Sequence, residues 1–528
     1  MAHSKKVVVI GSGLSAFGAI SALLEKNFDV QVIDVGKFLP PEVDSRVKKL
    51  RDVPLVERSD FFIENFLAEE SLIGVKKKMP RKGLFGSYFF YEEEMINSTQ
   101  SLPFSEAFGG YSVAWGAATL MPRMEDLRDL PFDFNDITEA AQALAQKFPI
   151  PYFEDSLTPF FPNLVTHSET AAIKLSHSQS FLKNCLSRLI TTSGDAVCLV
   201  GQARVATFST GINSCVYCGM CSSGCAFNSI FSTKQEISQL HEKGAIGYFP
   251  NRKVTRLIEL NDRVQIIVNN LESNKMETLE ADYVFVAAGT LNSTKIAIET
   301  FNVKNKKVNF LKTGNLVKGY FSLRKLGFDW PNQNTQANVF MESYNPNISE
   351  YWIHSQISTP NEIVIKKIGY LNKGSLAEIF KPLKKWFLSH LVLVMTNLHS
   401  STGPFYEVEF SANEGKSAFR GELIHSKKVR KLESRVSRFL DRKLMRIGFL
   451  PLPFTKKGSA NGFGYHLGGS MPMGGSGQMA TDSLGRFEDS SRISFVDTSV
   501  LPSIPSTTIG FLAAANAYRI ANAALLRD

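Results

Sequence analysis

The chain has few cysteines, few tryptophans and no long hydrophobic run. Only six Cys and four Trp occur in 528 residues, which excludes a small scaffold held by disulfides. Hydrophobic residues make up 44% and charged residues 21% of the sequence, a composition that excludes collagen, coiled coil and bulk disorder. The 59 basic residues only modestly outnumber the 50 acidic ones, so no nucleic-acid partner is expected.

The sequence also lacks a candidate for a membrane span or a secretion signal. The longest apolar stretch, Trp386 to Met395, is about half of the roughly eighteen residues that a span needs, and His390 interrupts it. The run Val7 to Ile10 is too short for the core of a signal peptide. We therefore expect a cytoplasmic protein. The stretch Phe380 to Leu388 mixes lysines with aromatic and aliphatic residues, which favours peripheral contact with the inner face of a membrane near 380–395. A buried helix with lysines at its rim is the alternative.

One complete strand–turn–helix–strand unit opens the chain. A short apolar strand, Val7 to Ile10, meets a glycine-rich turn, a helix follows to Leu24, and a second strand runs from Asp29 to Ile33. The residues that fit a dinucleotide site are Gly11 for the tight turn, Gly13 for close approach of the pyrophosphate, Ala16 for packing, and Asp34 for the ribose hydroxyl. The Asp34 carboxylate disfavours the 2′-phosphate of NADP. This unit alone does not distinguish NAD from FAD, and a glycine turn that binds no ligand is the alternative.

Four of the six cysteines lie within eleven residues. Cys215, Cys218, Cys221 and Cys225 have the spacing of a ferredoxin-type loop, which predicts an iron–sulfur cluster of the 4Fe-4S or 3Fe-4S type. The fourth ligand is Cys225 or a distant thiol (Cys185 or Cys198), or the cluster has three ligands. Structural zinc on four thiolates and no metal at all are the alternatives.

Later segments predict further elements. A hairpin is expected over Val254 to Leu260 and Val264 to Val268, and a second strand–glycine–helix step near Ala288 and Gly289. Alternation predicts antiparallel strands over Asn338 to Glu342, Tyr351 to Ser358 and Glu362 to Ile368, whereas helices are expected over Leu376 to Met395, Lys427 to Leu444 and Ile509 to Leu526.

Taken together and in order, these motifs resemble the glucose–methanol–choline (GMC) flavoprotein oxidoreductases. The resemblance runs nearly end to end and implies FAD as the cofactor. It implies that Gly110, Ser112 and Trp115 contact the flavin and that Val254 contacts the adenine. Ala288 and Gly289 would belong to the strand that returns to the cofactor, and Asp497 to the segment that closes over the flavin. His466, in a glycine-rich segment, falls on the family's catalytic histidine and is the expected base for the alcohol proton.

The cysteine loop is similar to that of an iron–sulfur subset of this family, which includes sugar dehydrogenases and long-chain alcohol oxidases. This resemblance implies oxidation of a sugar or glycoside hydroxyl, in a free or lipid-linked substrate. Electrons would leave through the cluster to a quinone or an electron-transfer protein. A long-chain alcohol oxidase or dehydrogenase is the first alternative, and a non-catalytic flavin and iron–sulfur electron-transfer protein is the second.

One departure concerns the family's second catalytic residue, a His or Asn. That position falls at or near Thr508, and a threonine hydroxyl is a poor base at neutral pH. Either His466 acts alone, with Thr508 holding the substrate oxygen, or another group such as His399 is the partner, or the chemistry is unusual. For His399, a solvent-facing loop histidine is the alternative.

The expected fold class is α/β: a Rossmann-like FAD-binding domain interleaved in sequence with an α+β substrate domain on an antiparallel sheet. The FAD-binding domain is expected from residues 1–125, from 211–310 with the cysteine loop, and from 458–528 with the catalytic histidine. Residues 126–210 are expected as a helical, substrate-side segment and 311–457 as the substrate-binding domain.

Overall fold

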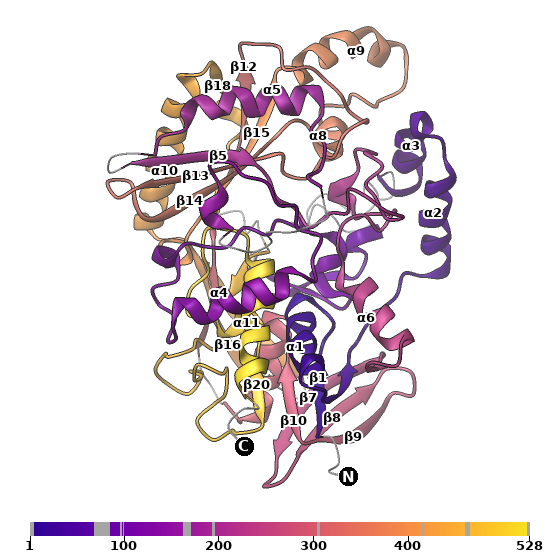
Figure 1. Ribbon diagram of the computed structural model, residues 1–528, viewed down its shortest axis with the longest axis vertical. Helices are drawn as coiled ribbons and strands as arrows, with labels where there is room; N and C mark the ends of the chain where they lie inside the picture. Colours follow the sequence, from indigo (N-terminus) through magenta and orange to yellow (C-terminus); the bar gives the residue numbers. More distant parts are fainter. Residues whose placement is uncertain are drawn as a thin grey trace.

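A parallel sheet and an antiparallel sheet form the two halves of the molecule (Figure 1). The computed structural model describes residues 5–67, 85–95, 98, 100–161, 171–192, 196–303, 307–413, 416–459 and 465–524. Both termini lie at the end that holds the parallel sheet, so the chain leaves this half, builds the other and returns.

The parallel sheet has five strands and is covered by helices that come from opposite ends of the chain. Its order is β20 (Ile493–Phe495), β10 (Tyr283–Val286), β1 (Lys6–Ile10), β2 (Asp29–Ile33) and β6 (Gly247–Phe249). β10 is buried throughout, as expected for a strand with both faces covered. α1 (Leu14–Glu25) packs along α11 (Ile509–Ala524), which fixes the last part of the chain against the first glycine turn.

The antiparallel sheet has six strands and two unlike faces. Its order is β18 (Phe449–Pro451), β12 (Gly314–Ser322), β15 (Leu391–Leu398), β14 (Ser349–Ser358), β13 (Val339–Asn345) and β5 (Val197–Gln202). Apolar residues of one face form a core with α5 (His177–Leu186) and α10 (Lys427–Met445). Because side chains alternate along a strand, the other face is free to line a cavity.

Smaller sheets complete the described part of the fold. A hairpin sheet is formed by β7 (Arg252–Glu259), β8 (Val264–Asn270) and β9 (Lys275–Ala281), and a two-stranded sheet by β3 (Phe90–Glu94) and β4 (Ser101–Ser105). A four-stranded sheet has the order β17 (Lys416–Ile424), β16 (Phe405–Asn413), β11 (Lys307–Lys312) and β19 (Leu467–Gly468). The other helices are α2 (Pro41–Asp52), α3 (Leu55–Phe62), α4 (Phe134–Ala145), α6 (Thr233–Glu242), α7 (Thr290–Thr300), α8 (Glu362–Lys367) and α9 (Ser375–Leu388).

The structure confirms the α/β fold class and the opening unit, and it corrects three local predictions. Glu362 to Ile368 is not a strand: it forms α8, because the Asn361 side chain accepts a hydrogen bond from the Val364 amide and caps a helix there. The helix expected to reach Met395 ends at Leu388, and β15 follows. The segment 126–210 holds α4 and α5 but also β5, which extends the antiparallel sheet.

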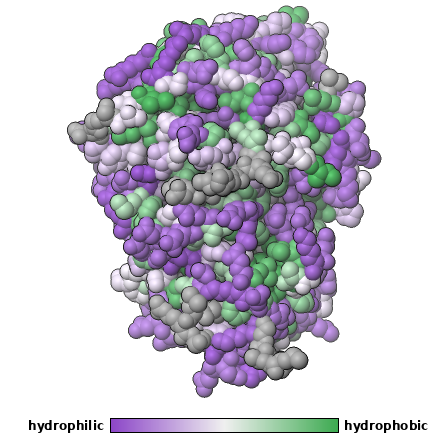
Figure 2. Space-filling model, viewed as in Figure 1, coloured by the Kyte–Doolittle hydropathy of each residue, from purple (hydrophilic) through white to green (hydrophobic). Residues whose placement is uncertain are grey.

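Within the described part of the chain, no helix combines the length and the apolar character needed to cross a bilayer. Hydrophilic residues cover most of the face shown in Figure 2, with hydrophobic residues between them in small groups.

Candidate active site

A single large cavity lies between the two halves and collects most of the motif residues. Its volume is about 1770 Å³, larger than the roughly 300–1,000 Å³ of an ordinary ligand pocket. The sequence predicts thirteen catalytic and cofactor-contacting positions, and all but Ala16 line this cavity. These twelve are Gly11, Gly13, Asp34, Gly110, Ser112, Trp115, Val254, Ala288, Gly289, His466, Asp497 and Thr508. Ala16 is buried in α1 behind it.

The first glycine turn forms a cradle at one end of the cavity. Gly11 has φ +105°, and a Cβ there would lie 2.4 Å from the Ala287 carbonyl oxygen, so only glycine fits between β1 and β10. A Cβ on Gly13 would come no closer than 4.0 Å to the protein, at Gly110. The space before Gly13 is therefore left for something else, and α1 begins there with its free amide groups, an arrangement that suits a pyrophosphate.

Asp34 closes the same end, at the end of β2. Its Oδ2 accepts hydrogen bonds from the Ser12 and Tyr248 hydroxyl groups. Burial raises the pKa of this carboxyl to about 6, against the opposing effect of those hydrogen bonds. The carboxylate is thus held in place at the rim of the cradle, where a ribose hydroxyl can donate to it.

Hydrogen bonds with the protein backbone hold three more of the predicted cofactor contacts in place: Ser112, Trp115 and Asp497. The Ser112 hydroxyl donates to the Gly109 carbonyl at 2.6 Å and the Trp115 indole to the Phe231 carbonyl at 2.8 Å. Asp497 accepts from the Gly289 amide at 2.9 Å, and burial raises the pKa of its carboxyl. This contact ties the C-terminal segment to the start of α7.

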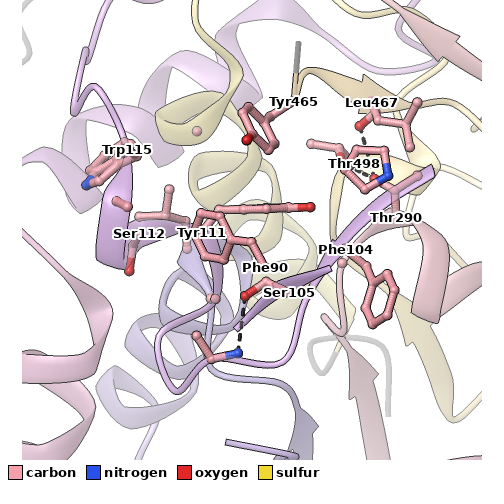
Figure 3. A pocket seen from close by; sticks show the side chains of 18 of the residues that line it. Phe90, Phe104, Ser105, Tyr111, Ser112, Trp115, Thr290, Tyr465, Leu467 and Thr498 are labelled. Atoms are coloured by element: carbon pink, nitrogen blue, oxygen red, sulfur yellow. Dashed lines mark hydrogen bonds between the residues drawn. The ribbon is translucent and has the colours of Figure 1, made fainter. Parts of the chain in front are cut away.

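Three aromatic side chains also line the cavity. Figure 3 shows Phe90, Tyr111 and Tyr465 grouped at the centre of the pocket; the Phe90 and Tyr111 rings lie 4.9 Å apart and the Tyr111 and Tyr465 rings 5.6 Å apart. The Tyr111 hydroxyl is buried and has no hydrogen-bond partner. A buried hydroxyl without a partner is unfavourable, which fits a site completed by a polar cofactor.

His466 borders the cavity just before the short strand β19. Its Nδ1 is buried without a hydrogen-bond partner. Burial first, and then the nearby His354 and Lys312, lower the pKa of this imidazole to about 4. The ring is therefore neutral at physiological pH and able to accept a proton.

Sequence reasoning missed the polar group behind His466. His354 on β14 and Glu342 on β13 are both completely buried, face each other across the hairpin, and join Nδ1 to Oε1 at 2.5 Å. Gln356, which lines the cavity, contacts His354 Nε2 at 3.2 Å. The only sequence signal was the alternation of β14; the pairing that brings Glu342 opposite His354 depends on the register of the hairpin.

The two candidates for a second catalytic residue differ in position. Thr508 lines the cavity, and its hydroxyl donates to the Ala118 carbonyl at 3.1 Å. His399 is buried away from the cavity, stacked on Tyr351 at 3.8 Å with Nε2 at 3.1 Å from the Asp126 carbonyl. It is neither a partner of His466 nor a solvent-facing loop residue.

The cysteine loop lies beside the cavity, and Cys221 lines it. Backbone amides approach the sulfurs: Thr335 N lies 3.3 Å from Cys221 Sγ and Ser229 N lies 3.2 Å from Cys225 Sγ. Burial raises the pKa of the Cys218 thiol to about 12, and it also raises the pKa of the Cys221 thiol well above its usual value. Among the residues that the structure describes, no three Cys, His, Asp or Glu side chains form a group that could hold a single metal ion.

The other two cysteines are far from this loop in the fold. Cys185 and Cys198 belong to the core between the antiparallel sheet and its helices, whereas Cys215, Cys221 and Cys225 pack against the core of the parallel half.

Comparison with known proteins identifies the fold. No known protein family matches the sequence, and no curated protein matches it either. The structure is similar to pyridoxine 4-oxidase from Mesorbium loti, with a TM-score of 0.59 and 11% identity over 98% of each chain. It is also similar to a fungal aryl-alcohol oxidase, with a TM-score of 0.57 and 12% identity over 99% of each chain. The chain therefore shares the fold of these two oxidases. A parallel sheet interleaved in sequence with an antiparallel one is the arrangement that the sequence resemblance implied.

Proposed function

We propose that this chain is an FAD-dependent oxidoreductase that acts on an alcohol group. The cavity is the observation that supports this proposal. It is lined both by the dinucleotide cradle at Gly11 and Gly13 and by the neutral imidazole of His466. Two proteins of the same fold are named as oxidases of alcohol-bearing compounds. FAD, when bound, would supply the two-electron acceptor for the hydride of the alcohol carbon.

The residues of the chain have separate roles in this proposal. Gly13 leaves room for the pyrophosphate, Asp34 would accept from the ribose, and the Tyr111 hydroxyl and the Gly289 region would meet the rest of the cofactor. His466 would take the hydroxyl proton. Thr508, whose hydroxyl proton is engaged by Ala118, can still accept a hydrogen bond from the substrate.

The acid limb of the pH profile tests the role of His466. Since only the neutral imidazole accepts a proton, flavin reduction should be insensitive to pH near neutrality and should fall as pH drops through about 4. In a His354→Gln variant the rate of flavin reduction should begin to fall at a higher pH, because the variant removes a neighbour whose charge lowers the pKa of His466. Stopped-flow reduction across pH measures both, and His177→Gln on the exposed start of α5 is the matched control. An unmoved limb in His354→Gln would contradict this assignment.

We also propose an iron–sulfur cluster on Cys215, Cys218, Cys221 and Cys225. The amide groups that approach Cys221 and Cys225 are consistent with it, since hydrogen bonds to sulfur stabilise and tune such clusters. The position of Cys185 and Cys198 in the other core favours Cys225 as the fourth ligand. A cluster, when bound, would supply one-electron transfer to a quinone or a redox protein. The reducing, cytoplasmic location predicted above would keep these thiols available.

Metal analysis of anaerobically purified protein tests the cluster. The wild type should contain about three or four irons per chain with matching sulfide, and Cys221→Ser should lose most of this iron while FAD remains bound. Cys185→Ser, in the separate core, is the control and should keep its iron. Iron-free wild-type protein would contradict the proposal, and zinc in place of iron would support the zinc alternative.

The substrate proposed first is a sugar or glycoside hydroxyl, free or lipid-linked. Three polar side chains that line the cavity on the antiparallel sheet, Asn315, Gln356 and Asn397, support it, and the Asn397 amide nitrogen lacks a partner. A long-chain alcohol is the second candidate, because Val317, Leu393 and Met395 line the same face. Anaerobic bleaching of the flavin band near about 450 nm by glycosides or by octanol separates the two. No bleaching by any alcohol would favour the electron-transfer alternative.

A further inference from the structure

Helix α9 carries an exposed apolar face. Leu376 is 70%, Ile379 68% and Leu383 59% exposed, and Phe380 and Trp386 are about half exposed. Residues three and four apart lie on the same side of a helix, so these five side chains form one stripe. Large apolar side chains gathered on one exposed face are unusual for a protein surface that meets only water.

A second apolar group continues this stripe at the end of the antiparallel sheet. Trp386 contacts Phe321 on β12 at 5.6 Å between ring centroids, and Phe321 pairs with Leu450 on β18. Leu450, Leu323 and Phe454 are exposed here, Phe454 fully. In Figure 2 hydrophobic residues reach the surface at the top of the molecule, where Figure 1 places α9. We call this surface the apolar end: Leu323, Leu376, Ile379, Phe380, Leu383, Trp386, Leu450 and Phe454.

Basic residues surround the apolar end. On α9 and in the loop before it the chain places four lysines against one acid, Glu378. A further set of basic residues flanks β18 and the end of β12. The exposed basic residues are Arg324, Lys325, Lys373, Lys385, Arg442, Arg446 and Lys456. Aromatic and aliphatic side chains ringed by cations match an anionic bilayer surface, with the apolar groups among the acyl chains and the cations at the headgroups.

The cavity leads from His466 toward this surface. Asn315 pairs with Asn397 near the catalytic end, and Phe321 pairs with Leu391 at the apolar end. Between them Val317, Leu393 and Met395 line the cavity. The cavity lining on β15 runs from Asn397 to Leu393, about 13 Å of strand, and changes along it from polar to apolar side chains.

Helix α8 brings the cavity to the surface beside α9. Lys367 lines the cavity and is exposed, which marks an opening there. Val364 lines the cavity and also joins the small core that α8 shares with α9. Lys384 of α9 donates to the Gly369 carbonyl at 2.6 Å, just after α8.

We propose that the apolar end docks on an anionic membrane and that the cavity takes an amphiphilic alcohol from that membrane, with its hydroxyl at His466 and its hydrocarbon part along β12 and β15 toward α8. The choice of substrate rests on the proposed function. The docking does not, because it concerns surface residues that contact neither cofactor nor reacting group.

Vesicle binding by the holoenzyme tests the docking. Flotation with vesicles of phosphatidylcholine and phosphatidylglycerol should recover the wild type, and added salt or pure phosphatidylcholine should weaken binding several-fold. The double variant Ile379→Asp/Leu383→Asp should lose at least about tenfold in binding. Leu260→Asp, an exposed residue on the distant hairpin turn, is the matched control and should bind as the wild type does. A wild type that does not float, or a double variant that floats equally well, overturns the docking.

A spectroscopic measurement avoids the risk that the double variant folds poorly. Anionic vesicles should shift the tryptophan emission of the wild type to shorter wavelength, and Trp386→Phe should abolish most of this shift while binding persists. A shift that is unchanged in Trp386→Phe would show that another face docks and would overturn the proposal.

The substrate part has its own readout. If docking is found, a long-chain alcohol or lipid-linked glycoside held in anionic vesicles should reduce the flavin at least about tenfold faster in the wild type than in Ile379→Asp/Leu383→Asp, whereas a short soluble alcohol should reduce both equally. Equal rates with vesicle-held substrate would overturn delivery from the membrane. No reduction by any alcohol, with vesicle binding intact, would overturn the proposed function and leave the docking standing.

Discussion

Replacing His466 by Asn is expected to slow flavin reduction by about 10²- to 10⁴-fold, the usual contribution of a positioned general base. Asparagine approximates the size and polarity of imidazole but cannot accept the alcohol proton. The imidazole is neutral because burial lowers its pKa to about 4, so the wild type holds the active form at neutral pH. Anaerobic stopped-flow reduction with a competent alcohol measures the loss.

The design of this experiment separates catalysis from folding and cofactor binding. His466→Asn should keep its full complement of FAD, since His466 is not one of the residues that form the dinucleotide cradle. His177→Asn makes the same change at an exposed helix start and should leave the rate unchanged. If His466→Asn reduces its flavin as fast as the wild type, His466 is not the base.

Replacing Gly13 by Val is expected to yield folded protein that purifies without FAD. Gly13 has φ −77°, which valine can adopt, and a Cβ there would lie 4.0 Å from the nearest protein atom. The side chain would instead occupy the space next to the N-terminus of α1 where a pyrophosphate is expected. Absorption spectra and nucleotide release on boiling measure the loss, and circular dichroism checks the fold.

A graded series strengthens this test. Gly13→Ala fills less of the space and should weaken FAD binding by about 1–3 kcal/mol, which is roughly 5- to 150-fold. Gly11→Ala should fail differently, by damaging the fold itself, because its Cβ would lie 2.4 Å from the Ala287 carbonyl oxygen. A yellow Gly13→Val protein with normal FAD content would show that no dinucleotide approaches this turn.

Local patterns could be predicted where neighbouring residues decide the structure. The strand before Gly11, the helix after it and the strand ending before Asp34 are contiguous, so their hydrogen bonds and burial depend on a short window of sequence. The hairpin over β7 and β8 was predictable for the same reason. Glu362 to Ile368 was not, because its apolar alternation fits a strand while the capping side chain of Asn361 makes it a helix.

The sequence by itself determined the two ends of the proposed chemistry: a glycine turn that leaves space for phosphate, and a histidine in a glycine-rich segment. Only the tertiary structure decided that both line one cavity, that Thr508 reaches it while His399 does not, and that His354 and Glu342 form a buried pair behind His466. The physical reason is that these groups are brought together by strand register and by the packing of α1 on α11, which depend on contacts across hundreds of residues rather than on local propensity.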